Sequence, residues 1–123
     1  MGDKKKILII DDEPMILELL QKMLETKFDV EKVNSAAKAI HFLNSAKADC
    51  ILLDITMPNI SGFDFLNDIR RIPSYFDVPI IIVSGNTGEE FFTQAKNSSA
   101  YAVISKPVKK DLLIQTIEKA INS

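Results

Sequence analysis

Three short segments that are apolar at every position constrain the fold of this 123-residue chain more than any other feature. Each ends directly at a polar residue: residues 7–10 at Asp11, residues 50–53 at Asp54, and residues 80–83 at Ser84. Such segments are typical of strands that are covered on both faces, as in a parallel sheet with helices on either side. The sequence therefore predicts an α/β domain.

Longer stretches with helical periodicity separate these strands. Pro14 suits the first turn of a helix with apolar residues at every fourth position from Ile16 to Leu24, and we expect this helix to end near Lys27. Ser35 is a favourable N-cap for the next helix. Five strand–helix units with right-handed crossovers are the simplest architecture. The remaining elements are weaker strands at 28–34 and 101–104 and helices after Gly62, over about 89–97, and ending near Ile121.

The composition is that of a single globular domain. Apolar residues make up 46% and charged residues 26%, which argues against disorder. A net charge of −2 gives no general attraction to nucleic acid or to membranes. The chain has neither an apolar run near the roughly 18 residues of a membrane span nor a signal peptide, so we expect a cytoplasmic protein. We expect one domain over 1–123, with a core at about 5–121 and no output domain in this chain.

Polar residues gather where the predicted strands end. Ligands of open parallel sheets bind at this edge. Asp11, Asp12 and Asp54 would repel one another there, so they require a cation, and carboxylate oxygens without His or Cys favour Mg²⁺, with Mn²⁺ possible. Lys106 would add a second positive charge, and Ser84 a hydroxyl donor. This combination indicates a phosphoryl-transfer site in which the Asp54 carboxylate is the nucleophile.

The order and spacing of these residues resemble a response-regulator receiver domain, the CheY-like family of two-component signalling. The resemblance covers about residues 5–121 and implies a flavodoxin-like, doubly wound, five-stranded parallel sheet with strand order 2-1-3-4-5. The matching segments are Ile9-Ile10-Asp11-Asp12-Glu13-Pro14, Leu52-Leu53-Asp54-Ile55-Thr56-Met57-Pro58, Gly62-Phe63, Ile82-Val83-Ser84-Gly85 and Ser105-Lys106-Pro107.

The resemblance also implies a role for each matching residue. Asp54 corresponds to the phosphoacceptor, and Ser84 and Lys106 correspond to the groups that bind the phosphoryl oxygens. The implied Mg²⁺ ligands are Asp11, Asp12, Asp54 and the backbone carbonyl of Thr56.

Other matching positions concern backbone shape and the conformational switch. Pro58 and Gly62 match the loop after the phosphorylation site, and Pro107 matches a residue that follows a cis peptide bond. Most receivers carry an aromatic switch residue where this chain has Val103, and Tyr101 is the nearest aromatic. The usual coupling between the switch hydroxyl and an aromatic ring is therefore in question.

Two adjacent aromatic residues lie on the helix that follows Ser84. Neighbouring positions on a helix cannot both face the core, so we expect either Phe91 or Phe92 to be exposed. Receiver domains present a partner surface near this turn, so the resemblance makes an exposed ring a candidate for partner contact, although a purely structural role is the favoured interpretation.

Together these features predict a phosphorylatable switch rather than a metabolic enzyme. The resemblance implies that the phosphodonor is a histidine kinase or a histidine phosphotransfer protein. The signal would pass to a downstream protein or to a tethered output domain, without direct binding to nucleic acid or membrane. The sequence leaves open whether this is a stand-alone receiver or part of a longer regulator or hybrid kinase.

Three alternatives compete with this interpretation. A hydrolase with an aspartyl-phosphate intermediate would need a second Asp where Thr56 stands. A nucleotide or flavin module would need a phosphate loop after the first strand, where Asp11 and Asp12 would repel a phosphate. A degenerate receiver would only bind partners. Val103 favours that alternative mildly, whereas the complete acidic trio opposes it.

Overall fold

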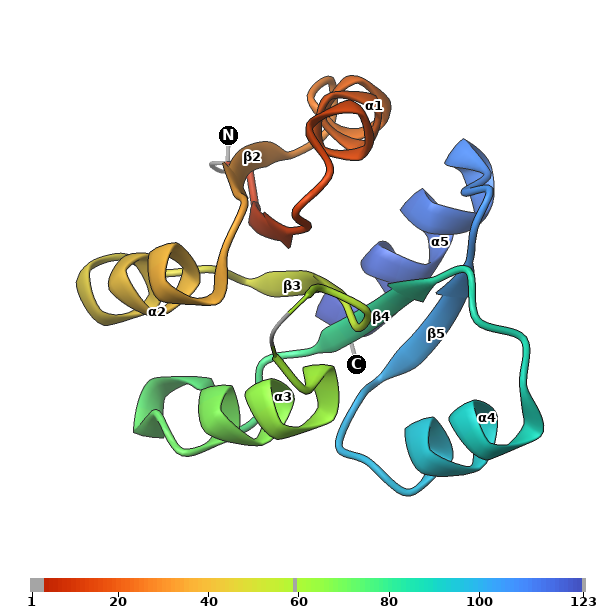
Figure 1. Ribbon diagram of the computed structural model, residues 1–123. Coiled ribbons are helices and arrows are strands. Elements are labelled where there is room, and N and C mark those ends of the chain that lie inside the picture. Colours follow the sequence, from red (N-terminus) through yellow and green to blue (C-terminus); the bar gives the residue numbers. More distant parts are fainter. Residues whose placement is uncertain (1–3, 59, 123) are drawn as a thin grey trace.

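The computed structural model describes residues 4–58 and 60–122 and confirms the predicted architecture. Within these residues, five parallel strands form one sheet in the order β2-β1-β3-β4-β5 (Figure 1). In the same part of the chain, no helix is long and apolar enough to cross a membrane. The strands are β1 (Lys6–Ile10), β2 (Asp29–Val33), β3 (Cys50–Asp54), β4 (Ile80–Ser84) and β5 (Ala102–Ser105). The helices are α1 (Pro14–Leu24), α2 (Ala36–Ser45), α3 (Gly62–Arg70), the short 3-10 helix η1 (Pro73–Tyr75), α4 (Glu89–Lys96) and α5 (Lys110–Ile121).

The helices cover both faces of the sheet. Helices α1 and α5 pack on one face, and α2, α3 and α4 pack on the other (Figure 1). Because side chains alternate along a strand, β1 sends Ile7 and Ile9 toward α1 and α5, and Leu8 and Ile10 toward the opposite core. Every residue of β3 and β4 is buried, which confirms the prediction of fully covered central strands.

The ends of several elements differ slightly from the prediction. Helix α1 ends at Leu24 rather than near Lys27, because the N–H groups of Lys27 and Phe28 both donate to the Leu24 carbonyl and form a turn. Strand β2 is shorter than expected at both ends, β5 begins and ends one residue later, and α4 ends one residue earlier. The Ser35 hydroxyl accepts the N–H of Lys38, which confirms the predicted N-cap of α2.

Two polar side chains that the sequence did not single out organise the edge of the sheet opposite to Asp54. The Tyr75 side chain is buried, and its hydroxyl donates to the Ala46 carbonyl and accepts the Ala48 N–H. Arg70 donates to the carbonyls of Tyr75 and Ser99. Side chains from α3 and η1 thus tie together the loops that lead into β3, β4 and β5.

The turn between β3 and α3 is packed tightly at Gly62. A Cβ atom at this position would overlap the carbonyl oxygen, the Cα atom and the side chain of Ile55. Glycine is therefore required by space, and it lets the first turn of α3 lie directly against the residue that follows Asp54. Gly85, after β4, is different, because a Cβ atom there would meet no atom within 4 Å.

We predict that Gly62→Ala destabilises the protein by about 1–3 kcal/mol, the usual cost of overpacking. The measurement is the midpoint of urea unfolding at constant slope. Gly85→Ala is the matched control and should leave the midpoint nearly unchanged. Equal midpoints for the two variants would show that the contact with Ile55 is not restrictive.

Candidate functional site

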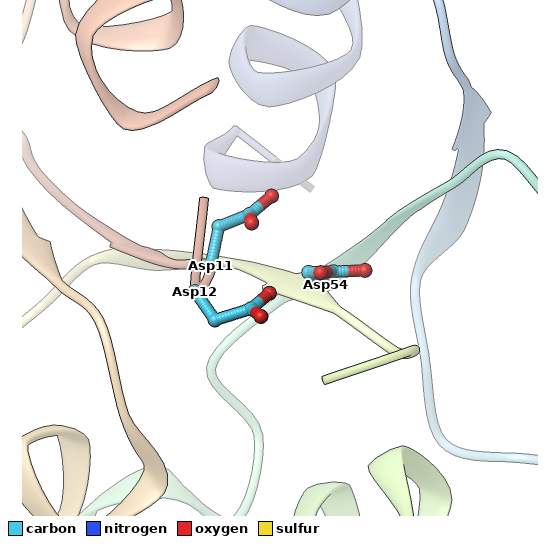
Figure 2. Close-up of side chains that lie close together, drawn as sticks. All are labelled: Asp11, Asp12 and Asp54. Atoms are coloured by element: carbon cyan, nitrogen blue, oxygen red, sulfur yellow. The ribbon is translucent and has the colours of Figure 1, made fainter. Parts of the chain in front are cut away.

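Three carboxylates meet at the carboxyl edge of the sheet. Asp11 and Asp12 directly follow β1, and Asp54 is the last residue of the neighbouring strand β3. The register pairs Ile10 with Leu53, so Asp11 and Asp54 leave the sheet side by side. One oxygen from each of the three side chains lies within 4.8 Å of the other two (Figure 2). The structure thus brings together the acidic residues that the sequence singled out.

These carboxylates are costly to place together. Asp11 and Asp54 are almost fully buried, whereas Asp12 is more exposed. Burial raises the pKa of Asp11 above its ordinary value. The N–H of Glu13 opposes this rise, the negative charge of Asp54 adds to it, and Lys106 opposes it. Two like charges about 5 Å apart repel by roughly 3 kcal/mol at an effective dielectric constant near 20, so the cluster favours a bound cation.

Lys106 brings a positive charge to this cluster. Its Nζ atom lies 3.4 Å from Asp11 Oδ2, 3.7 Å from Glu13 Oε1 and 3.9 Å from Asp54 Oδ1. The backbone N–H of Lys106 donates to the carbonyl of Ser84, so this hydrogen bond to the end of β4 positions the backbone from which the lysine side chain extends. The pairing of β4 with β5 therefore delivers the ammonium group to the acidic residues.

Asp54 itself is held by the loop that follows it. Its Oδ1 atom accepts the backbone N–H of Thr56 at 3.1 Å and the Thr56 hydroxyl at 3.0 Å. The resemblance assigned only the backbone carbonyl of Thr56 to the site, and it did not indicate this side-chain contact. A hydroxyl two residues after a carboxylate was the available signal.

Ser84 lies on the strand next to Asp54. The register pairs Asp54 with Val83, so Ser84 stands one residue further toward the edge of the sheet. The residue is fully buried, and its hydroxyl oxygen accepts the N–H of Asn86 at 3.0 Å. Because that bond uses an acceptor position, the Ser84 hydroxyl keeps its proton for an additional acceptor.

The remaining predicted positions surround this centre. The Lys106–Pro107 bond is cis, as the resemblance implied. Pro58 is exposed in the loop after β3. Val103 is half-buried against the core under α4, and Tyr101, just before β5, is 44% exposed. The position expected for a switch aromatic therefore holds a packed aliphatic side chain.

The two adjacent phenylalanines of α4 face different environments. Phe91 is buried and packs on Phe63 of α3, with ring centroids 6.0 Å apart. Phe92 is 41% exposed. The prediction that one of the pair is exposed is confirmed, and Phe92 is that residue.

The cluster offers the kind of ligand atoms that a hard divalent cation prefers. Among the described residues, the ligand atoms that converge are carboxylate oxygens only, supplied by Asp11, Asp12 and Asp54. Oxygen ligands of this kind suit Mg²⁺ or Mn²⁺ and not the nitrogen- and sulfur-seeking metals. The residues present therefore fit the metal that the sequence predicts.

Comparison with known proteins agrees with this geometry. A sequence profile of the response regulator receiver domain matches residues 7–118. The chain belongs to the response regulator receiver domain family. It is 31% identical over 125 residues to the hydrogenase transcriptional regulatory protein HoxA of Cupriavidus necator, covering all of this chain and 26% of that protein. It is 29% identical to protein PilH of Pseudomonas aeruginosa, covering 94% of this chain and 97% of PilH.

Solved structures show the same fold. A CheY-like receiver domain from Methanospirillum hungatei superposes with a TM-score of 0.88 at 26% identity, covering 98% of this chain and 95% of that one. The receiver fold predicted from the sequence is thereby confirmed. The chain spans only about a quarter of the length of HoxA and of several other transcriptional regulators that it matches.

We predict that Mg²⁺ raises the melting temperature, because the ion binds the native cluster and not the unfolded chain. The expected stabilisation is about 1–3 kcal/mol at roughly 10–100-fold saturation. Asp12→Ala removes one ligand and should reduce the increase. A titration of melting temperature against Mg²⁺ concentration tests both statements.

Charge crowding gives a second prediction. Without metal, Asp54→Asn should be more stable than the unsubstituted protein by about 1 kcal/mol, because one repelling charge is removed while an oxygen remains to accept the Thr56 bonds. Thermal unfolding in the presence of a chelator is the measurement. A lower melting temperature for the variant would contradict the repulsion among these carboxylates.

Proposed function

We propose that Asp54 accepts a phosphoryl group from a phosphohistidine of a histidine kinase or a histidine phosphotransfer protein, in a Mg²⁺-dependent reaction. The observation that supports this most is the position of Asp54, a buried carboxylate that clusters with Asp11 and Asp12 and has a lysine ammonium 3.9 Å from its Oδ1 atom. Membership of the receiver family supports the same reaction class.

The proposed reaction is a direct displacement at phosphorus. A carboxylate oxygen of Asp54 forms a bond to phosphorus while the bond from phosphorus to the imidazole nitrogen breaks. The imidazole keeps the electron pair and takes up a proton. A Mg²⁺ ion held by Asp11, Asp12 and Asp54 would neutralise charge on the transferred oxygens. Lys106 would pair with a further phosphoryl oxygen, and the Ser84 hydroxyl would donate to another.

This chemistry makes the domain a switch that assists its own phosphorylation, and not an enzyme that turns over a metabolite. The added charge would draw Ser84 and Lys106 toward the phosphoryl group and shift the surface around α4. The signal would then leave through a downstream protein or through an output domain joined to the receiver. We place this exchange in the cytoplasm.

The alternatives have less support from the site. A hydrolase would need an acid or base where Thr56 donates its hydroxyl to Asp54. A flavin or nucleotide module would need phosphate-binding groups after β1, and that loop begins with Asp11 and Asp12. A degenerate receiver that only binds partners is the second candidate, and the packed Val103 in place of a switch aromatic is the observation in its favour.

We predict a single acid-labile phosphoryl adduct on Asp54 after treatment with a small-molecule phosphodonor and Mg²⁺. Intact-mass and peptide mass spectrometry would locate it. Asp54→Asn should abolish the adduct, and Asp12→Ala should slow its formation by weakening the metal site. An adduct of equal yield in Asp54→Asn would refute the assignment, and no adduct on the unsubstituted chain would favour the degenerate receiver.

Position 103 supplies no aromatic ring that changes rotamer on phosphorylation, so we expect the structural change to involve other residues. Val103 is β-branched and stiff at χ1, so it does not swing as a ring does. The segment after β4 contains Gly85. Two hydrogen bonds stabilise its turns: the Asn86 N–H donates to the Ser84 hydroxyl oxygen, and the Gly88 N–H donates to the Asn86 side-chain oxygen. A pull on the Ser84 hydroxyl would disturb these bonds and move the start of α4.

We therefore predict that a phosphoryl mimic on Asp54 changes amide chemical shifts and hydrogen exchange most between residues 84 and 97. Tyr101 should change less. The matched control is Asp54→Asn treated identically, which should show no such change. If the 84–97 segment is silent while Tyr101 changes rotamer, Tyr101 acts as the aromatic switch and the backbone mechanism is wrong.

A further inference from the structure

Glu13 is a charged residue at the site whose identity is not explained by local structure. It is the N-cap of α1, a position that favours Ser, Thr, Asp or Asn, yet its side chain makes no capping hydrogen bond. Its backbone is held on both sides, since its N–H donates to Asp11 Oδ1 at 2.9 Å and its carbonyl accepts the N–H groups of Ile16 and Leu17. Helix α1 therefore fixes where Glu13 lies without using its carboxylate.

The carboxylate of Glu13 reaches Lys106 instead. Its Oε1 atom lies 3.7 Å from Lys106 Nζ, which is closer than the 3.9 Å between that nitrogen and Asp54 Oδ1. The lysine side chain is only 20% exposed, whereas that of Glu13 is 61% exposed. The ammonium group is thus shared between the buried carboxylates of Asp11 and Asp54 and the surface carboxylate of Glu13, and Asp54 is the most distant of the three.

We propose that Glu13 is a positioning residue that holds the Lys106 ammonium near Asp11 until a phosphoryl group on Asp54 takes the place of the Glu13 carboxylate. This inference rests on the proposed phosphorylation of Asp54. When Asp54 carries a phosphoryl group, Lys106 exchanges its contact with Glu13 for a contact with a phosphoryl oxygen. Glu13 therefore competes with the phosphoryl group for the lysine and lowers the affinity of the site for it.

The first test needs neither metal nor phosphoryl group. In the full chain labelled for NMR and kept in a chelator, Glu13→Gln should shift the Nζ and ε-methylene signals of Lys106. Glu18→Gln removes the same charge from an exposed position of the same helix and should leave those signals unchanged. Unchanged Lys106 signals in Glu13→Gln would overturn the proposal.

The second test measures the competition directly. The measurement is made at saturating Mg²⁺, so that both variants are compared in the metal-bound form. The apparent affinity for beryllofluoride should increase about two- to fivefold in Glu13→Gln, the size expected for a partly exposed ion pair. Glu18→Gln should bind it like the unsubstituted chain. Melting curves at the same Mg²⁺ concentration confirm that each variant is folded.

The outcomes separate this inference from the proposed function. An unchanged or weaker affinity for beryllofluoride in Glu13→Gln overturns the positioning role while leaving phosphorylation of Asp54 intact. If the unsubstituted chain binds no beryllofluoride, the proposed function fails, and the metal-free Lys106 signals alone decide whether Glu13 holds the lysine. An equal increase in Glu18→Gln would assign the effect to net charge and not to the contact.

Discussion

Repulsion between buried carboxylates is the constraint around which this domain is organised. Asp11 and Asp54 lie side by side because β1 and β3 are neighbours, and the strand residues that lead to them, 7–10 and 50–53, are buried. The fold compensates with Lys106 and with hydrogen bonds from the N–H groups of Glu13 and Thr56. The pKa of Asp11 is nevertheless raised, mainly because burial disfavours the charged form and in smaller part because of the Asp54 charge. A site with an unbalanced negative charge is ready to take up a cation.

The elements around the site differ in how freely they can respond to a phosphoryl group. The start of α3 is packed closely, because Gly62 lies against Ile55 with no room for a side chain. The segment after β4 is open at Gly85 and rests on hydrogen bonds to the side chains of Ser84 and Asn86. Under the proposed function, we therefore expect phosphorylation of Asp54 to affect the start of α4 more than the start of α3.

Under the proposed function, the aliphatic Val103 directs attention to the apolar contacts of α4 as the route of the signal. Phe91 connects the core under α4 to Phe63 of α3, and the exposed Phe92 packs on Phe91 with ring centroids 5.3 Å apart. A movement of α4 would alter how much of Phe92 is available to a partner. The surface would then change because the whole helix moves, and not because one side chain changes rotamer.

The sequence by itself determined the succession of strands and helices along the chain, because continuous apolar runs and helical periodicity are local properties of the chain. It also identified Asp11, Asp12, Asp54, Ser84 and Lys106, since each lies at or just after the end of an apolar segment and the carboxyl ends of parallel strands share one edge.

The tertiary structure alone decided how these groups are connected. The contact between Glu13 and Lys106 joins residues from opposite ends of the chain, and the roles of Tyr75 and Arg70 depend on loops that meet only after folding. No local pattern encodes such contacts, because they arise from the relative placement of α1, β5 and the loops that the sheet brings together.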